Sequence, residues 1–385
     1  MSNALKPTVS TRVGVVGAGQ LARMMGEAAQ DVGVVVTVLA ESMDDSAVAT
    51  CAAVELGAPA DRDALLRLAD RVDVITFDHE LVDLDVLSEL EASGVALRPS
   101  SEALRFAVDK AYQRRTFAAA GLPVPSFMVV QSSNDEGLAD FLDELGTLPV
   151  VKASRGGYDG RGVIFPASRE SALSAIDELA RRGDVVVEER RTLLNEVAQL
   201  VVRALDGSLV FYPVVTTLQR DGMCVEVRYP SSLDEEELAV LHELSERVAN
   251  AVHGVGVLAI EYFITEEGTL INEVALRPHN TGHWTIEGAS ASQFAQHLRA
   301  VSGQALDEVA IRYPHAVMVN VVGAAAPGSL ASAQGVTGTY VHDYGKSWRP
   351  GRKLGHVTAL GDEPLGPHVR AWDGARAYGT VTRET

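Results

Sequence analysis

Apolar and polar residues alternate along the first hundred positions in a pattern that predicts strands separated by helices. VGVVGAGQLARMMGEAAQDVG has the pattern of a strand, a tight turn and a helix, and VVVTVLA follows as a second strand. Two further apolar runs, DVITFDHE and VALRPS, come later, with helical patterns such as DALLRLAD between them. Strands that alternate with helices are typical of a parallel α/β sheet. This first unit is predicted to end near residue 105.

The pattern changes in the middle of the chain. AVDKAYQRRTFAAAG predicts a helix closed by Gly121, and the prolines of LPVPSFMVV mark a boundary before a new strand system. From about 125 to 300 the strands come in pairs, VAQLVVRAL with SLVFYPVV and VLAIEYFIT with TLINEVAL. Such pairs predict an α+β unit with antiparallel sheets. The remainder, 301–385, is rich in glycine and predicts a small terminal domain with short strands.

Composition limits the classes of protein that fit. A chain of 385 residues is too long for one ordinary core, so two or three domains are expected. The net charge of −19 argues against nonspecific nucleic-acid binding, which needs a basic surface. Two distant cysteines, Cys51 and Cys224, fit no metal or redox spacing and favour a reducing cytoplasm.

No membrane or export segment is expected. MSNALKPTVS lacks the apolar core of a signal peptide. The longest apolar stretch, AVMVNVVGAAA, contains Asn320 and is too short to span a bilayer.

A glycine-rich segment, KASRGGYDGRG, follows the apolar run LPVV at residues 152–162. Four glycines make such a loop costly to order, which suggests that it holds a ligand. The neighbouring lysine and arginines indicate that this ligand is anionic.

The turn GAGQLA, Gly17 to Ala22, lies between a predicted strand and a predicted helix. The motif G-x-G-x-x-A holds a phosphate on backbone N–H groups at a helix N-terminus, and Glu41 stands at about the spacing of a ribose-binding acid. A dinucleotide site is one interpretation. An ordinary tight strand–helix turn is the other.

The segment VLAIEYFITEEGTLINEVAL predicts a hairpin with a three-residue loop that ends at Gly268. Thr265 would then pair with Thr269, and Glu261 would lie opposite Glu273 on the same face. Opposed carboxylates repel each other unless a cation such as Mg²⁺ lies between them, although a solvated polar pair is the alternative. Asn272 would point to the other face and would need a bulge to join this site.

Three more polar clusters are candidates for binding. ALRPHNTGHWTIEG contains two histidines four residues apart, which could ligate zinc, begin a capped helix, or join an anion-plus-Mg²⁺ site. DYGKSWRPGRKLGHV gathers four cations in one short loop of an acidic protein and is interpreted as a phosphate cradle or a solvated basic turn. DVVVEERRTLLNEVAQLVVRA has carboxylates after a buried strand, typical of edge charge or of a nucleotide-binding hinge.

Five segments of the chain carry a resemblance to a known family: GAGQLARM, KASRGGYDGRG, VVVEE, INEVALRPHNTGHWTIEG and RPGRKLGHV. Taken together, they strongly resemble the N5-carboxyaminoimidazole ribonucleotide synthetases, which are ATP-grasp enzymes of purine biosynthesis. The resemblance runs from about residue 12 to 358. It implies a Rossmann-like N-terminal (pre-ATP-grasp) domain without a dinucleotide over 1–105. An ATP-grasp domain would cover 106–300, with a small lid at about 125–190, and a small β-rich C-terminal domain would cover 301–385.

The resemblance also implies the roles of individual residues. Lys110 and Lys152 would contact ATP phosphates, the loop 156–162 would cover them, Glu188 and neighbouring backbone would bind adenine, and Glu196 the ribose. Glu261 and Glu273 would hold Mg²⁺ with Asn272. The full set implied for ATP binding is Lys110, Lys152, Gly156, Gly157, Tyr158, Asp159, Gly160, Arg161, Gly162, Glu188, Glu189, Arg190, Arg191, Glu196, Asn272 and Glu273.

The ribonucleotide would lie beside the ATP site. The residues implied for binding it are Gln20, Glu80, Arg161, Lys346, Arg352 and Lys353, and those implied for catalysis are Tyr158, Asp159, Arg277 and His279. The sequence departs from the common F-E-x-E stretch with Asp78 in TFDHE, and Thr217 and Gln219 stand where an N-x-H pair often follows YPVV.

The implied reaction is carboxylation of 5-aminoimidazole ribonucleotide with ATP and bicarbonate through carboxyphosphate, in a cytoplasmic homodimer. Three other functions fit parts of the sequence: a different ATP-grasp ligase, a nicotinamide-dependent oxidoreductase built on GAGQLA, and a non-catalytic nucleotide-binding module. The oxidoreductase leaves the glycine-rich segment and the carboxylate hairpin unexplained.

Overall fold

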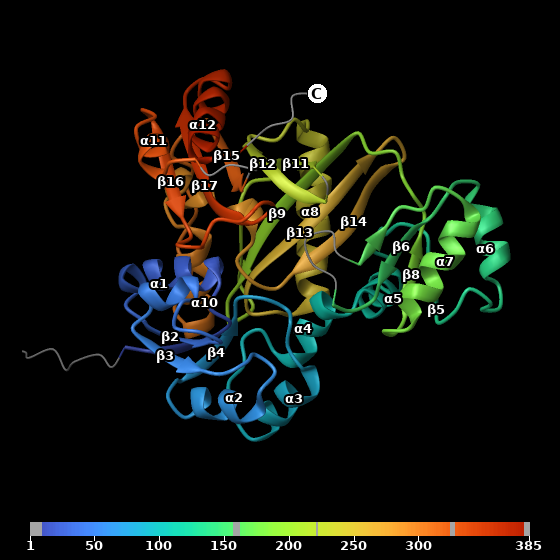
Figure 1. Cartoon of the computed structure of the whole chain (residues 1–385), viewed down its shortest axis with the longest axis horizontal. Helices are drawn as coiled ribbons and strands as arrows, with labels where there is room; N and C mark the ends of the chain where they lie inside the picture. Colours follow the sequence, from blue (N-terminus) through green and yellow to red (C-terminus); the bar gives the residue numbers. More distant parts are fainter. Residues whose placement is uncertain (1–9, 157–161, 221, 324–327, 381–385) are drawn as a thin grey trace, which may run out of the picture.

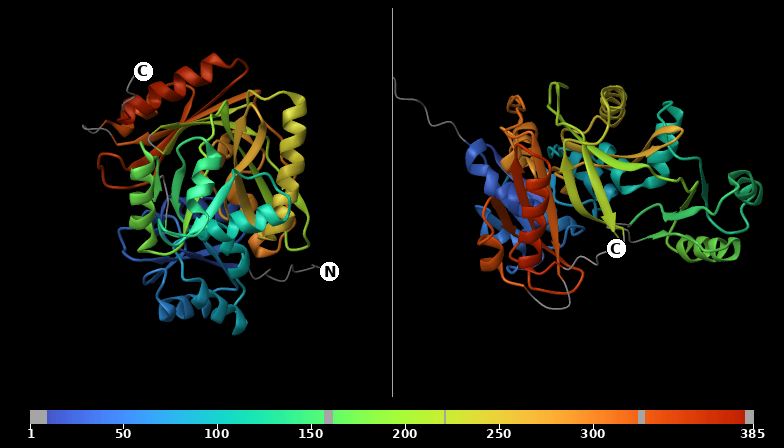
Figure 2. Two further views of the ribbon diagram at one scale, coloured as in Figure 1. Left: turned by 90° about the vertical axis from the view of Figure 1, so that its right-hand side faces the viewer. Right: turned by 90° about the horizontal axis from the view of Figure 1, so that it is seen from above.

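The computed structural model describes residues 10–156, 162–220, 222–323 and 328–380. Within these ranges the strands form three sheets. Figure 1 shows the N-terminal sheet in blue, a small lid sheet in green at the opposite end, and a large sheet between and above them. The right-hand view of Figure 2 shows the lid projecting away from the rest of the molecule. This arrangement confirms the predicted combination of an α/β unit with α+β units.

The N-terminal sheet is parallel, with strand order β3-β2-β1-β4. Val13 and Val15 of β1 face a core shared with α1, whereas Val16 faces a second core shared with α2 and α3. Helices on both faces bury the strands, which explains their nearly continuous apolar runs. The elements are β1 Arg12–Val16, α1 Gln20–Val32, β2 Val35–Ala40, the 3₁₀ turn η1 Ser46–Ala49, β3 Ala53–Leu56, α2 Arg62–Ala69, β4 Val74–Phe77 and α3 Leu84–Ala92.

Two helices lead from this sheet to the lid, α4 (Ser101–Val108) and α5 (Lys110–Ala119). The segment AVDKAYQRRTFAAAG, predicted as one helix, is interrupted at Asp109. Asp109 has an extended backbone, and its side chain accepts a hydrogen bond from the backbone N–H of Tyr112, so it caps α5. An aspartate at this position stabilises the start of a new helix, which is why the pattern breaks there.

The lid is an antiparallel sheet of order β5-β8-β6-β7 with its own apolar core. Alternate residues of β8, Val185 and Val187, face that core. The elements are β5 Phe127–Val130, α6 Leu138–Leu145, β6 Val150–Ala153, β7 Val163–Ile164, α7 Arg169–Ala180 and β8 Val185–Glu188.

The large sheet is antiparallel, in the order β14-β13-β9-β11-β12-β15-β17-β16, with β10 also paired to β9. Both predicted hairpins are confirmed, because β9 pairs with β10 and β13 with β14. Its strands are β9 Asn195–Arg203, β10 Leu209–Phe211, β11 Val215–Arg220, β12 Met223–Tyr229, β13 Gly256–Thr265, β14 Gly268–Ala275, β15 His315–Val322, β16 Thr339–Asp343 and β17 Lys353–Gly361.

The C-terminal strands extend this same sheet, because β15 pairs with β12. The expectation of short C-terminal strands was wrong, since β15 has 8 residues and β17 has 9. Alternation of Val317, Val319 and Val321 buries one face of these strands under α12, so long strands are favourable here. The remaining helices are α8 Glu235–Val252, η2 Asn280–Gly282, α9 Thr285–Gly288, α10 Gln293–Ser302, α11 Leu330–Gln334 and α12 Leu365–Tyr378.

Helix α10 joins the large sheet to the N-terminal sheet. Phe294, Leu298 and Val301 pack in the same core as α1 and β1, and Figure 1 shows α10 directly beside α1. Helix α10 also contacts β4 and β13, so it links the N-terminal sheet to the hairpin β13–β14. No helix in the described ranges is both long and apolar enough to cross a lipid bilayer.

Candidate active site

Two facing carboxylates lie on the hairpin β13–β14. Glu261 is directly opposite Glu273, which confirms the predicted arrangement. The turn, however, is shorter than the predicted three-residue loop, because Thr265 pairs with Gly268 and not with Thr269.

A β-bulge compensates for the shorter turn. Tyr262 pairs with Ile271 and Glu261 pairs with Glu273, which leaves Asn272 as an extra residue on β14. Without the bulge, Glu261 would face Asn272, and Glu273 would point to the other face of the sheet. The predicted loop was therefore wrong while the predicted carboxylate pair is right, and the bulge that Asn272 needed is present.

The two carboxylates differ in their electrostatic environment. Burial, together with the negative charges of Glu273 and Glu196, raises the pKa of Glu261 to about 8. The ammonium of Lys110, whose Nζ lies 2.8 Å from Glu273 Oε2, lowers the pKa of Glu273 to about 2. A cation placed between the two groups would offset the repulsion that, together with burial, raises the pKa of Glu261.

A second group of charges lies where α5 meets the lid. The carboxylate of Glu188 is buried, with Arg114 Nε 2.7 Å from one oxygen and Lys152 Nζ 2.6 Å from the other. Burial opposes ionisation of Glu188, but the two cations outweigh it and lower its pKa to about 2. Burial also lowers the pKa of Lys152. Glu188 is therefore ionised, because each of its oxygens has a cationic partner.

The sequence motifs did not indicate that Glu188 is already bonded to side chains. Its carboxylate belongs to this buried ion-pair group, so contacts from the 188–191 hinge to a nucleotide would come from the backbone and from the following residues. Glu189 pairs with Arg191 at 3.0 Å, and the Arg190 guanidinium lies over the Phe165 ring. Glu196, at the start of β9, is half-buried, and burial raises its pKa.

Two pairs of residues far apart in sequence mark the other half of the site. Arg277 Nε lies 2.8 Å from Glu80 Oε2, and Lys346 donates a hydrogen bond to the side-chain oxygen of Gln20. Gln20 and Glu80 belong to the N-terminal unit, whereas Arg277 follows β14 and Lys346 lies between β16 and β17 of the large sheet. Each pair therefore joins the N-terminal unit to a loop of the large sheet. His279 Nε2 is 3.9 Å from Glu261 Oε1, so the ion pair Glu80–Arg277 and the carboxylate pair belong to one region.

The turn GAGQLA is filled by a carboxylate of the chain itself. Asp78 accepts hydrogen bonds from the N–H of Gly19 at 2.5 Å and of Ala22 at 3.1 Å, at the start of α1. A Cβ at Gly19 would lie only 2.6 Å from Asp78 Oδ2, so this position requires glycine. The anion position of the motif is therefore occupied by Asp78, which favours the interpretation of a strand–helix turn over that of a dinucleotide site.

The cations of the basic loop after β16 have different partners within the chain. Lys346 binds Gln20, whereas Arg352 donates hydrogen bonds to the backbone and side-chain oxygens of Ser347. Lys353 begins β17 and pairs with Val322 in the strand register.

Part of the predicted site lies outside the described residues. These positions are Gly157, Tyr158, Asp159, Gly160 and Arg161, whereas Gly156 and Gly162 at either end of the loop are described. Both of these glycines have positive φ, of 74° and 77°, which supports the idea that the loop requires glycine at its ends.

The zinc interpretation of the two histidines gains no support. His283 is fully buried, its Nδ1 lies 3.0 Å from Gln293 Nε2, and burial lowers its pKa well below the usual value. In the part of the chain that the structure describes, no three histidine, cysteine, aspartate or glutamate side chains are grouped so that they could hold a metal ion.

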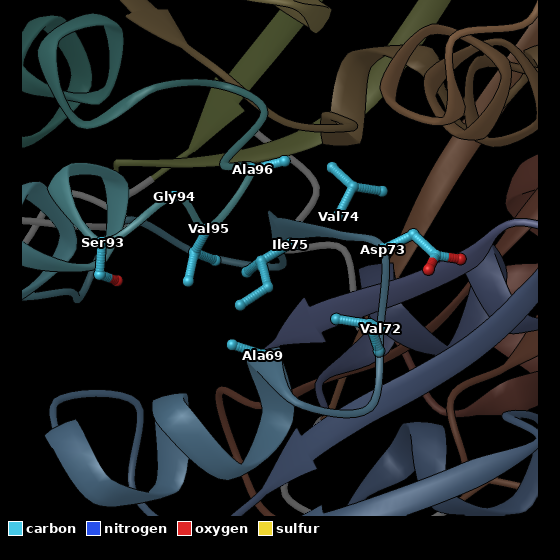
Figure 3. Close-up of a pocket in the computed structure, with 9 residues that line it drawn as sticks. All are labelled: Ala69, Val72, Asp73, Val74, Ile75, Ser93, Gly94, Val95 and Ala96. Carbon is cyan, nitrogen blue, oxygen red and sulfur yellow. The ribbon is translucent and has the colours of Figure 1, made fainter.

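A cavity of about 230 Å³ lies elsewhere, between the end of α2, β4 and the segment Ser93–Ala96. Figure 3 shows that small apolar side chains line it, with Asp73 at one side. None of the candidate site residues belongs to this cavity.

Sequence reasoning missed two contributors to the site, Arg114 and the capping role of Asp78. Arg114 lies in an ordinary amphipathic pattern next to Arg115, and only its burial in the folded chain distinguishes it. The departure of TFDHE from the F-E-x-E pattern marked Asp78 as unusual. The motif does not show, however, that Asp78 binds the turn at Gly19.

The sheet arrangement, the carboxylate hairpin and the lysines at the lid are those of an ATP-grasp ligase. An ATP-grasp domain model matches residues 115–294, and a ribonucleotide synthetase preATP-grasp domain model matches residues 10–108. A phosphoribosylaminoimidazole carboxylase C-terminal domain model matches residues 316–365. The class is thus shown, and the predicted three-part architecture is confirmed.

Comparison with individual proteins identifies the family. The chain is 42% identical over 370 residues to the N5-carboxyaminoimidazole ribonucleotide synthase of Mycobacterium tuberculosis, covering 94% of this chain and 86% of that protein. The structure of the Aspergillus clavatus synthase with ATP is similar, with a TM-score of 0.88, 30% identity and coverage of 96% and 99%. The same enzyme with ADP and 5-aminoimidazole ribonucleotide gives a TM-score of 0.85, 30% identity and coverage of 95% and 99%. The chain belongs to the N5-carboxyaminoimidazole ribonucleotide synthase family, which confirms the resemblance seen in its motifs.

Proposed function

We propose that the chain carboxylates the exocyclic amine of 5-aminoimidazole ribonucleotide in purine biosynthesis, with ATP and bicarbonate as co-substrates and ADP and phosphate as products. One observation carries this proposal. The opposed carboxylates of Glu261 and Glu273, with Lys110 beside them, lie next to the Glu80–Arg277 pair. This arrangement supports a site for a nucleoside triphosphate beside a second, polar site for an acceptor.

The carboxylate pair fits Mg²⁺ as the ion that accompanies ATP. Two carboxylate oxygens and the Asn272 bulge offer the hard oxygen ligands that this ion prefers. Burial and the negative charge of the facing Glu273 raise the pKa of Glu261, and a cation bound between the two groups would favour its ionised form. When bound there, the ion would neutralise charge on the phosphate oxygens.

The cations of the chain would support phosphoryl transfer. Bicarbonate attacks the γ-phosphate to give carboxyphosphate and ADP, a reaction that needs alignment and charge neutralisation more than covalent help from side chains. Lys110 and Lys152 would bind the phosphates, and Arg277 and His279 would orient the acceptor and bicarbonate. Glu188 would hold Lys152 in place, because their 2.6 Å ion pair is buried.

The second half-reaction would use the glycine-rich loop. Carboxyphosphate releases CO₂ in a pocket closed to water, and the ribonucleotide amine attacks it. Asp159 would take the proton of the amine, with Tyr158 and Arg161 beside the substrate, as the family resemblance implies. Gln20 with Lys346, and Arg352 with Lys353, would bind the 5′-phosphate.

We further propose a homodimer in the cytoplasm, with domain boundaries near residues 105 and 300. The two cysteines support a reducing compartment, because Cys224 is buried and Cys51 partly so, and the structure describes both as free thiols.

ADP release tests the function. It is measured with ATP and Mg²⁺, with and without bicarbonate and the ribonucleotide. Release that requires the ribonucleotide is expected. Bicarbonate-dependent release that ignores the ribonucleotide would favour another ATP-grasp ligase, and binding of ATP without any release would favour a nucleotide-binding module.

Two substitutions test the assigned roles. Glu273→Gln is expected to require far more Mg²⁺ for half-maximal rate, and an unchanged requirement would remove the carboxylate pair from the metal site. Asp159→Asn is expected to lose carboxylation while it retains ATP affinity, and undiminished turnover would remove Asp159 from the role of base.

A further inference from the structure

Arg114 is a buried arginine with three different acceptors. The residue lies in the middle of α5 and is 1% exposed. Nε donates to Glu188 Oε1 at 2.7 Å, Nη1 to Gln113 Oε1 at 2.8 Å, and Nη2 to the backbone oxygen of Asn272 at 2.6 Å. The planar guanidinium suits such a fork of acceptors, which a lysine ammonium cannot span.

The third of these acceptors belongs to the bulge of β14. A residue that is extra in a strand loses its regular partner in the ladder, so its backbone groups need partners elsewhere. Arg114 supplies one to the carbonyl of Asn272. The bulge in turn decides the face of Glu273, because an unbroken ladder from the turn would place Asn272 opposite Glu261.

Helix α5 is thus attached to β14 at two neighbouring points. Lys110, one turn before Arg114, binds the side chain of Glu273, and Arg114 binds the backbone of Asn272. The same guanidinium reaches Glu188 of the lid, whose other oxygen holds Lys152. Figure 1 shows α5 beside the lid strands, where the lid joins the rest of the molecule.

We propose that Arg114 is a positioning residue that holds the Asn272 bulge and so keeps Glu273 opposite Glu261 in the orientation that binds a divalent cation with the nucleotide. This inference rests on the proposed metal role of the carboxylate pair. Arg114 acts through the backbone of β14 and is not itself in contact with substrate.

If Arg114 served only to neutralise Glu188, Arg114→Lys would keep the Mg²⁺ dependence of the wild type. Arg114→Lys keeps a positive charge next to Glu188 but loses the fork, so the bulge loses its donor while the ion pair remains. Arg114→Gln removes the charge and keeps one donor, and it serves as the second variant if the lysine variant does not fold. Arg115→Lys is the matched control, because Arg115 is the exposed neighbour on the same helix.

The first readout is binding and not turnover. Calorimetric titration of ADP at fixed free Mg²⁺ concentrations measures how much Mg²⁺ each variant needs. Groups that orient metal ligands typically contribute 10–100-fold to metal affinity, so Arg114→Lys is expected to need at least about tenfold more Mg²⁺ than the wild type. Arg115→Lys is expected to match the wild type.

The second readout is hydrogen exchange of residues 268–275, followed by mass spectrometry. Exchange there is expected to be faster in Arg114→Lys than in Arg115→Lys, because the bulge has lost its donor. Unchanged Mg²⁺ dependence in a folded Arg114→Lys, or in Arg114→Gln where that variant replaces it, overturns the inference.

Glu273→Gln separates this inference from the proposed metal site. If Glu273→Gln weakens Mg²⁺-dependent ADP binding and the Arg114 variants do not, the inference alone fails. If the Arg114 variants weaken it and Glu273→Gln does not, Arg114 does not act through the pair, and both assignments fail.

Discussion

Buried His297 makes the stability of this protein depend on pH in a way that can be isolated. The imidazole is fully buried on α10, with Nδ1 accepting from the N–H of Val257 at 3.0 Å and Nε2 2.8 Å from Thr76 Oγ1. Both ring nitrogens are therefore satisfied in the neutral tautomer that carries its proton on Nε2. A second proton would displace the bond from Val257.

The magnitude follows from the pKa of this group. Burial lowers the pKa of His297 from 6.5 to about 3 in the folded chain, and no charged neighbour contributes to the shift. The unfolded chain therefore binds the extra proton first, and stability that is complete above pH 6.5 falls as the pH decreases toward 3. At about 1.4 kcal/mol per pH unit, His297 destabilises the fold by about 2 kcal/mol between pH 6.5 and 5.

Urea unfolding at pH 7 and pH 5, followed by tryptophan fluorescence, measures this effect. His297→Gln keeps a donor and an acceptor but does not titrate, so its loss of stability between these pH values should be about 2 kcal/mol smaller than that of the wild type. His253→Asn is the control, because His253 is exposed and its left-handed backbone, with φ 55°, is one that asparagine tolerates. Equal pH dependence in His297→Gln and the wild type would refute the reasoning, as would an equal reduction in the control.

Two further predictions concern Gly19 and Asp109. Gly19→Ala places a Cβ 2.6 Å from Asp78 Oδ2, so it should destabilise the chain by about 1–2 kcal/mol in urea unfolding. It should also raise the KM for the ribonucleotide more than that for ATP. Gly366→Ala, whose Cβ would meet only the end of the Arg370 side chain, should match the wild type in both assays, and equal losses would contradict the role of the Asp78 cap. Asp109→Ala removes the cap of α5 and should cost about 1–2 kcal/mol, whereas Arg155→Ala removes only an exposed partner of that carboxylate and should cost less than about 1 kcal/mol. The reverse order in urea unfolding would show that the ion pair matters more than the cap.

The sequence predicted the sheets well because periodicity along the chain reports burial directly. The alternating valines of β1 and the paired runs of β9–β10 and β13–β14 are local patterns, and each became the expected element. The hairpin shows the limit of local counting. The turn is one residue shorter than predicted and Asn272 is one extra residue on β14, and these two differences offset each other, so the opposition of Glu261 and Glu273 was predicted from an incorrect loop.

Contacts between distant residues could not be predicted in this way. Asp78 is 59 residues from Gly19, and Arg114 is 158 residues from Asn272, so no spacing rule links either pair. Both depend on tertiary packing that places a buried charge beside backbone groups. The motifs indicated which residue types the chemistry needs, whereas the residues that hold them in position became visible only in the folded chain.

The pairing of β12 with β15 has a consequence for engineering and for gene fusion. Although separate family models describe the central and C-terminal segments, their strands share one continuous hydrogen-bond ladder. A chimera joined between residues 294 and 316 must therefore reproduce the complementary edge of β12 as well as the linker. A junction at α4 or α5 would leave every sheet intact, because the chain passes there from the N-terminal sheet to the lid and these two sheets share no strand. Exchange of the N-terminal unit between relatives breaks no strand pairing, but it must keep the side chains of α1 and β1 that pack against α10.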